Sequence, residues 1–310
     1  MRRLLIVATV LLAVAILAGL LMRHTLLQGE LRERVEARLS TTLGQRVSIG
    51  RLGVSFFPRL AVSGSDVQIG DAPSEAPGVA IRRVRILPRI GSLLSRDVVI
   101  EQVQLDGFVV SVVRDEAGWH VPSAVPSPTA GENGGIVVER VGLTDARIRV
   151  FDRLTGGEIQ ERSGIDSLYA DVTVDGGGLR LSSITGRVGG AEISGDARID
   201  PTEARLELSA DRITDADLPA FLELLGSERP DSLRLAEAAS LSAHLRVDRA
   251  SARLSGTGTL RAPEVVLDPL QLQRFEAPFV IDGPRLSFEP ATFALYDGAH
   301  EGRVDVDLAT

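Results

Sequence analysis

The histidines and acidic residues of this 310-residue chain are the side chains best suited to chemistry. The histidines are His24, His120, His244 and His300. None has a partner at i+4 that would form a metal-binding pair on a helix. Asp305 and Asp307 are two residues apart, but in a strand this spacing places both on one solvated face. The sequence therefore predicts no catalytic residue, no metal site and no enzyme activity.

Other chemical signatures are absent as well. The chain has no cysteine, which excludes disulfides and thiolate chemistry. The segment "SGTGTL" at 255–260 lacks the third glycine of a dinucleotide-binding fingerprint and does not open a helix, so no cofactor is expected. A net charge of -8 and a pI near 5.2 argue against nucleic acid as a partner. The function must therefore come from larger elements of the chain.

The first such element is an apolar N-terminal segment. Residues 4–22 are interrupted only by Thr9 and Gly19, and arginines stand on both sides. At ~1.5 Å per residue the segment spans roughly 28 Å, close to the ~30 Å hydrocarbon core of a bilayer. We expect an uncleaved transmembrane anchor, with residues 1–3 in the cytoplasm and the rest exported. A cleavable signal peptide is the alternative, although no polar cleavage region follows the apolar run.

An amphipathic helix is predicted at 25–43. Its apolar residues recur every four positions, at Leu27, Leu31, Val35 and Leu39, with charged residues between them. Such a helix can cap the end of a sheet or lie on the membrane surface, and capping is the preferred interpretation.

From residue 44 the period changes from four to two, which is typical of strands with one apolar face. A β segment is expected at 44–120, and a phase slip at Arg82-Arg83 suggests a bulge. The candidate residues for an apolar groove are Val47, Ile49, Val54, Phe56, Leu60, Val62, Val67 and Ile69.

The remainder of the chain repeats this pattern. Residues 121–134 are proline-rich and read as a loop, and alternation resumes over 135–310. "IEQVQLDGFVVSV" at 100–112 aligns with "VERVGLTDARIRV" at 138–150, which suggests a sheet that grows by similar strand pairs. A helix is expected near 215–226, with Asp215 or Asp217 as its cap, and a weaker one at 232–240.

The predicted fold is mainly β, with few helices and one long, curved, antiparallel sheet that forms an apolar groove. A sheet of this length needs its apolar face covered. It can close into a sandwich, or it can curl into a trough that is covered by something other than protein.

The arrangement resembles a known family. The anchor, the amphipathic helix, "LGQRVSIG", "FFPRLAVSGSDVQIG" and "ILPRIGSLLSRDVVIEQVQLDG" look like the start of the AsmA family of bacterial envelope proteins. The segment 256–308 resembles the repeated sheet segment of the same family. Members that run longer would make this chain a short member or part of a longer protein.

The resemblance implies an inner-membrane protein with its bulk in the periplasm and a role in outer-membrane biogenesis. It also implies a likeness to TamB and to VPS13-type bridge proteins, which carry lipid along apolar grooves. The expected partners are the membrane, a phospholipid ligand and an outer-membrane or envelope protein. The alternative is a scaffold without lipid that modulates assembly or targeting of outer-membrane proteins.

Overall fold

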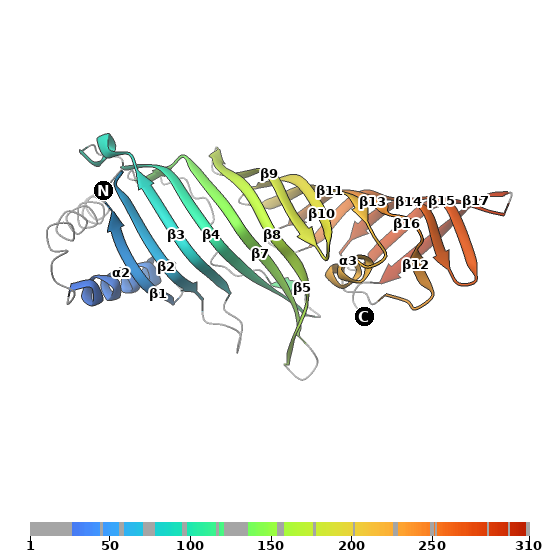
Figure 1. Cartoon of the computed structure of the whole chain (residues 1–310), viewed down its shortest axis with the longest axis horizontal. Coiled ribbons are helices and arrows are strands. Elements are labelled where there is room, and N and C mark those ends of the chain that lie inside the picture. Colours follow the sequence, from blue (N-terminus) through green and yellow to red (C-terminus); the bar gives the residue numbers. More distant parts are fainter. Residues whose placement is uncertain are drawn as a thin grey trace. The chain divides into compact units, whose positions relative to one another are not determined.

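The computed structural model is mainly β (Figure 1). It describes residues 27–43, 46–55, 59–70, 78–94, 98–115, 118–120, 136–153, 158–175, 178–200, 202–225, 229–248, 251, 253–283, 285–296 and 298–307. The predicted anchor at 4–22 and the predicted loop at 121–134 lie outside these residues. Among the described helices, none combines the length and the hydropathy needed to cross a membrane.

The chain divides into two compact units. The first contains residues 1–111, 121–146 and 170–179, and the second contains 112–120, 147–169 and 180–310. The strands belong to one 17-stranded sheet in the described part of the chain, and β4, β7, β8 and β9 contribute residues to both units.

The elements follow one another with few helices between them. In chain order they are α2 (Leu27–Leu43), β1 (Val47–Ser55), β2 (Ala61–Ile69), β3 (Val79–Pro88), the 3-10 helix η1 (Ile90–Leu94), β4 (Val98–Asp115), β5 (Gly118–His120), β6 (Ile136–Val138), β7 (Arg140–Arg153), β8 (Ile159–Asp175), β9 (Gly178–Val188), β10 (Ala191–Ile199), β11 (Glu203–Ile213), α3 (Leu218–Leu225), β12 (Leu233–Leu235), β13 (Ala239–Asp248), β14 (Leu254–Leu267), β15 (Leu270–Asp282), β16 (Arg285–Leu295) and β17 (Gly298–Asp307).

Most strands pair antiparallel with the next strand in the chain, as from β1 to β4 and from β13 to β17. The prediction of a wholly antiparallel sheet is wrong at β4 and β6, which pair parallel, with Val98 opposite Ile136 and Ile100 opposite Val138. These pairs have the same offset as the aligned segments 100–112 and 138–150. The two copies of the repeat therefore begin side by side and in the same direction.

The helices differ from their predictions in detail. The helix α2 confirms the predicted helix at 25–43, and α3 confirms the one near 215–226. The helix predicted at 232–240 is wrong, because these residues form β12 and the start of β13. Leu233 and Leu235 extend the sheet beside β14, so tertiary pairing overrides the weak helical pattern.

Candidate functional site

The first unit has a sheet face made of apolar rows. Strands β1 to β4 place Val54, Val62, Ile86 and Val103 directly opposite one another, and a neighbouring row contains Leu52, Gly64, Val84 and Leu105. Each of the seven large side chains in these rows is half-buried. The rows therefore form a continuous apolar surface that keeps part of its area accessible.

The opposite face of the same strands is polar. The row Gly53, Ser63, Arg85 and Gln104 alternates with the apolar rows, and Arg85 and Gln104 are exposed. This two-faced pattern is what alternating strands produce when one face is hydrated and the other is not.

A line of irregular residues crosses the strands of the first unit. Gly50, Asp66, Arg82 and Gly107 follow one another from β1 to β4, and the regular strand pairing skips each of them. Asp66 and Gly107 have left-handed backbones, with φ of 57° and 65°. The register is the same on both sides of this line, so the phase slip at Arg82 is not the predicted bulge with one extra residue in a single strand.

This line keeps the apolar face continuous. A Cβ atom at Gly64 would lie 3.0 Å from Val84 Cγ1 and 3.6 Å from Val67 Cγ2, so positions 64 and 67 share a face although they are three residues apart. All the strands slip together. The apolar side chains on either side of the line therefore remain on one face of the sheet.

Arg82 fixes the line on the polar side. Its Nη2 donates to Asp106 at 2.7 Å and to Asp145 at 3.0 Å, and these bonds, led by that with Asp106, raise the pKa of Arg82. The guanidinium crosses Gly107, where a Cβ atom would lie 2.9 Å from Arg82 Nε. Asp145, with φ of 50°, occupies the position in the second repeat that Gly107 occupies in the first.

The predicted groove residues divide into two groups. Val47, Ile49 and Val67 are fully buried and form a core cluster, with Ile69 packed against it. Val35 of α2 packs on the same cluster, in agreement with the predicted capping role. The structure thus places these four groove candidates under protein.

The second group remains accessible. Val54, Leu60 and Val62 are half-buried, and Phe56 lies outside the described residues. Of the predicted helix stripe, Leu39 is partly exposed. The side chains of Leu27 and Leu31 lie outside the described set. The accessible apolar rows also contain Ile86 and Val103, which the groove prediction did not include.

The second unit has a comparable face over β11 to β17. One row contains Leu206, Leu245, Gly256, Ile281 and Leu286, and the next contains Leu208, Ala243, Gly258, Phe279, Phe288 and Val304. Phe279, Ile281 and Leu286 are buried, whereas Val304 at the β17 end is 52% exposed. Apolar surface again runs across several strands.

Glycines let this face pack closely. A Cβ atom at Gly258 would lie 2.2 Å from Phe279 Cζ, because the phenyl ring rests on the glycine. Phe279 also makes an edge-to-face contact with Phe288, with ring centroids 5.9 Å apart. The Phe279 ring thus occupies the space over Gly258 that a side chain at position 258 would otherwise fill.

One part of this face is covered by α3. Leu218, Ala220, Phe221 and Leu224 of the helix pack on a core that includes Val188, Ile213, Leu235 and Leu272. Leu241 contacts this covered core and also the cluster around Phe279. The covered and accessible parts of the face are therefore continuous.

Asp217 attaches α3 to the sheet. Its carboxylate accepts hydrogen bonds from Gly190 N at 2.7 Å, Thr214 N at 2.9 Å and Thr214 Oγ1 at 2.6 Å. Burial acts to raise the pKa of Asp217, but these hydrogen bonds outweigh burial and lower it below its ordinary 3.8. Of the two predicted caps, Asp217 directly precedes α3, while Asp215 instead binds Leu235 N and Arg229.

The histidines in the described residues do not assemble a reactive site. His244 Nδ1 lies 3.6 Å from Glu207 Oε1 on an exposed face, and His300 stacks on Phe293 with centroids 5.7 Å apart. Within the described part of the chain, no three histidine or acidic side chains are grouped as metal ligands. The site that the geometry supports is an extended apolar surface.

Comparison with known proteins bears on the same part of the chain. A search of curated proteins found no match. The model of the AsmA family matches residues 2–123, a segment that includes β1 to β3 and the apolar rows of the first unit. The resemblance drawn from the sequence is thereby confirmed for the N-terminal segment. Residues 2–123 are therefore similar to the AsmA family.

Proposed function

We propose that this protein binds phospholipid acyl chains along the apolar face of its sheet. In this proposal it is anchored in the bacterial inner membrane, its bulk lies in the periplasm, and the lipid is carried toward the outer membrane. The observation that carries the proposal is the pair of half-buried apolar rows on β1 to β4. The match of residues 2–123 to the AsmA family model supports the envelope setting.

The energetics suit such a ligand. Each buried methylene contributes ~0.8 kcal/mol, so a chain of ~16 carbons gains on the order of 12 kcal/mol before the costs of binding. An aliphatic chain needs no hydrogen-bonding partner, and the rows from Val54 to Val103 offer none. A contiguous, partly accessible apolar surface such as the rows on β1 to β4 is typical of an interaction site.

Photo-crosslinking from the two faces of one strand tests the proposal. A photoreactive amino acid replaces Val103 on the apolar face or its neighbour Gln104 on the polar face of β4 in the full-length protein in cells. Leu245 and Arg246 on β13 form the same kind of pair in the second unit. We expect lipid adducts, identified by mass spectrometry, from Val103 and Leu245 and much less from the two polar positions.

Two results would contradict the proposal. Equal lipid labelling from both faces would show that the label reports nearby membrane and not a bound chain. Protein adducts without lipid from Val103 and Leu245 would favour a scaffold that holds an envelope protein on this face.

A further inference from the structure

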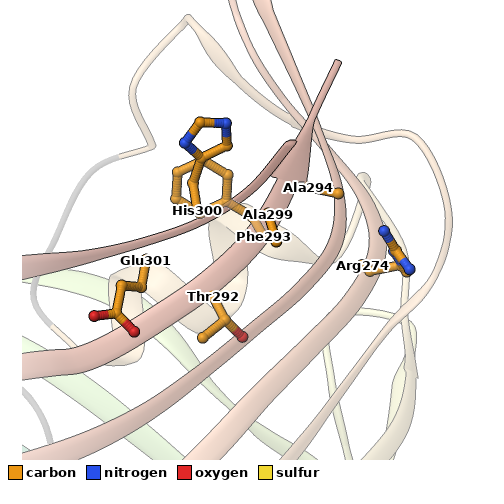
Figure 2. A pocket seen from close by; sticks show the side chains of 7 residues that line it. All are labelled: Arg274, Thr292, Phe293, Ala294, Ala299, His300 and Glu301. Carbon is orange, nitrogen blue, oxygen red and sulfur yellow. The ribbon is translucent and has the colours of Figure 1, made fainter. Parts of the chain in front are cut away.

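The second unit contains a shallow pocket away from the rows described above (Figure 2). It has a volume of about 440 Å³ and lies where β15, β16 and β17 meet. Its lining residues are Arg274, Thr292, Phe293, Ala294, Ala299, His300 and Glu301. This volume is within the range of small-molecule sites.

The strand register explains the shape of the pocket. Ala294 lies opposite Ala299, and Thr292 lies opposite Glu301, so these four side chains share one face of the sheet. The small alanines leave a depression between larger neighbours. Phe293 packs into the core that α3 covers, which fixes the strand beneath the pocket.

Two opposite charges lie at the sides of this depression. Figure 2 shows Arg274 on one side, Glu301 on the other and Thr292 between them. Within the described residues, neither Arg274 nor Glu301 forms an ion pair. Glu276, two residues from Arg274, forms its ion pair with Arg261 at 2.8 Å. The pocket thus offers one guanidinium and one carboxylate that are both free to bind a ligand.

The backbone at Arg274 has an unusual conformation. The pairing of β15 with β16 is irregular between Gln273 and Glu276, and Arg274 has a left-handed backbone with φ of 52°. A non-glycine residue adopts this conformation at a cost in free energy, and such residues concentrate at functional sites. From this irregular position Arg274 lines the pocket.

Apolar side chains are exposed next to the pocket. Leu267 and Leu270 close the β14–β15 hairpin, and Tyr296 stands at the β16–β17 turn, two residues beyond Ala294. Tyr296 is 88% exposed, and the two leucines are partly exposed. The β15–β16 pairing places these two hairpin ends at the same edge of the sheet. A ligand with both charges and an aliphatic part would fit this arrangement.

We propose that this pocket binds the zwitterionic headgroup of a phospholipid that carries a phosphate and a primary ammonium, such as phosphatidylethanolamine. Arg274 binds the phosphate, Glu301 and the Thr292 oxygen accept from the ammonium, and Leu267, Leu270 and Tyr296 contact the first part of the acyl chains. A guanidinium is well suited to phosphate because its donors form a planar fork. This inference rests on the proposed function and adds a headgroup preference to it.

The test measures binding of short-chain lipids to the purified full-length protein by isothermal titration calorimetry. Dihexanoyl-phosphatidylethanolamine presents both charges, and dihexanoyl-phosphatidylglycerol presents the phosphate without the ammonium. Glycerophosphoethanolamine presents the headgroup without chains. We expect the wild-type protein to bind the ethanolamine lipid about tenfold more tightly than the glycerol lipid, since a charged hydrogen bond is lost. The chain-free headgroup should bind more weakly than either lipid.

Variants separate the two charges. Arg274→Gln should weaken binding of both lipids by about tenfold, because the phosphate loses its partner. Glu301→Gln should remove the preference for ethanolamine and leave binding of the glycerol lipid unchanged. The matched controls are Arg212→Gln on β11 and Glu237→Gln before β13, both exposed and outside the pocket.

Three outcomes would overturn the inference. Equal affinity for the two lipids, unaffected by Arg274→Gln, would remove the headgroup site while the acyl-chain function stands. Equal affinity for the chain-free headgroup and the ethanolamine lipid would assign the pocket to a soluble phosphate compound. Binding of neither lipid, together with no lipid adducts from Val103, would contradict both proposals.

Discussion

The two units use a helix beside the sheet in different ways. In the first unit α2 lies along the edge of β1, and in the second α3 lies over the face of the strands. Beside the edge cap, the apolar rows of β1 to β4 stay half-buried, whereas face covering buries one part of the apolar surface in the second unit. The comparison teaches that a few helical turns decide which part of a long apolar sheet remains available to a ligand.

Side chains of α2 form hydrogen bonds with backbone groups along β1 that a neighbouring strand could otherwise bind. Ser40 Oγ accepts from Val47 N at 2.9 Å, Glu36 Oε1 accepts from Ile49 N at 2.7 Å, and Arg32 Nη1 donates to Gly50 O at 3.3 Å. These three side chains are four residues apart, so they form one stripe of the helix. The stripe therefore binds three backbone groups of β1 that could otherwise pair with another strand.

The largest effect is expected from releasing α3. Asp217→Ala removes the acceptor for Gly190 N and for both donors of Thr214. Loss of these bonds to a buried carboxylate should lower the free energy of unfolding by about 3 kcal/mol. Denaturant unfolding measures the loss, and hydrogen exchange should show faster opening of α3. Asp211→Ala at an exposed position of β11 is the control, and equal losses in the two variants would contradict the tether.

The same carboxylate predicts a pH dependence. The folded-state pKa of Asp217 lies below 3.8, so its stabilising contribution is complete above 3.8 and is lost as pH falls through the lower folded value. Asp217→Asn should therefore reduce the fall in the free energy of unfolding as the pH is lowered below about 5. An unchanged slope would show that the hydrogen bonds of Asp217 do not distinguish its protonation states.

A smaller loss of stability is expected where the Phe279 ring packs on Gly258 in the second unit. Gly258→Ala places a Cβ atom where Phe279 Cζ and the backbone oxygen of Ser242 already lie, at 2.2 and 2.3 Å. Overpacking should cost about 2 kcal/mol of unfolding free energy. Gly302→Ala on β17 is the control, because no atom lies within 4 Å of its added Cβ. Equal stability of the two variants would show that the Phe279 ring moves away freely.

Weakening the edge cap in the first unit should cost less. Glu36→Ala leaves Ile49 N without its acceptor and should lower the free energy of unfolding by about 1.5 kcal/mol. Hydrogen exchange at Ile49 should accelerate while exchange within β3 does not. Glu33→Ala, on an exposed position of the same helix, should leave both rates unchanged.

The smallest effect belongs to the exposed ion pairs on the polar face. Arg82→Gln removes the bonds to Asp106 and Asp145 and should cost about 1 kcal/mol or less, since these groups are partly solvated. Arg85→Gln, an exposed arginine on the same strand, is the control. A loss above that seen for Asp217→Ala would mean that the irregular line, and not α3, is the most sensitive feature of the molecule.

Alternation in the sequence is sufficient to predict the mainly β fold, and a four-residue period and helix caps predict the amphipathic helix and the helix near 215–226. The alignment of 100–112 with 138–150 also anticipated a repeated strand. It did not show that the repeats pair parallel, because strand direction depends on the path of the connecting chain. Nor did the groove prediction separate Val47 from Val54, since local alternation does not show that Val35 of α2 packs on the cluster that contains Val47.

Three properties can be read from the amino-acid sequence alone: which residues are apolar, their period along each strand and the absence of thiol chemistry. Those properties depend on composition and local spacing alone. Tertiary structure decided the rest: that Ser40 and Glu36 cap β1, that the strands slip together at Asp66 and Gly107, and that Arg274 and Glu301 share a pocket. Each of these arrangements depends on how α2 packs beside β1 or on the register of neighbouring strands, and no local pattern specifies either.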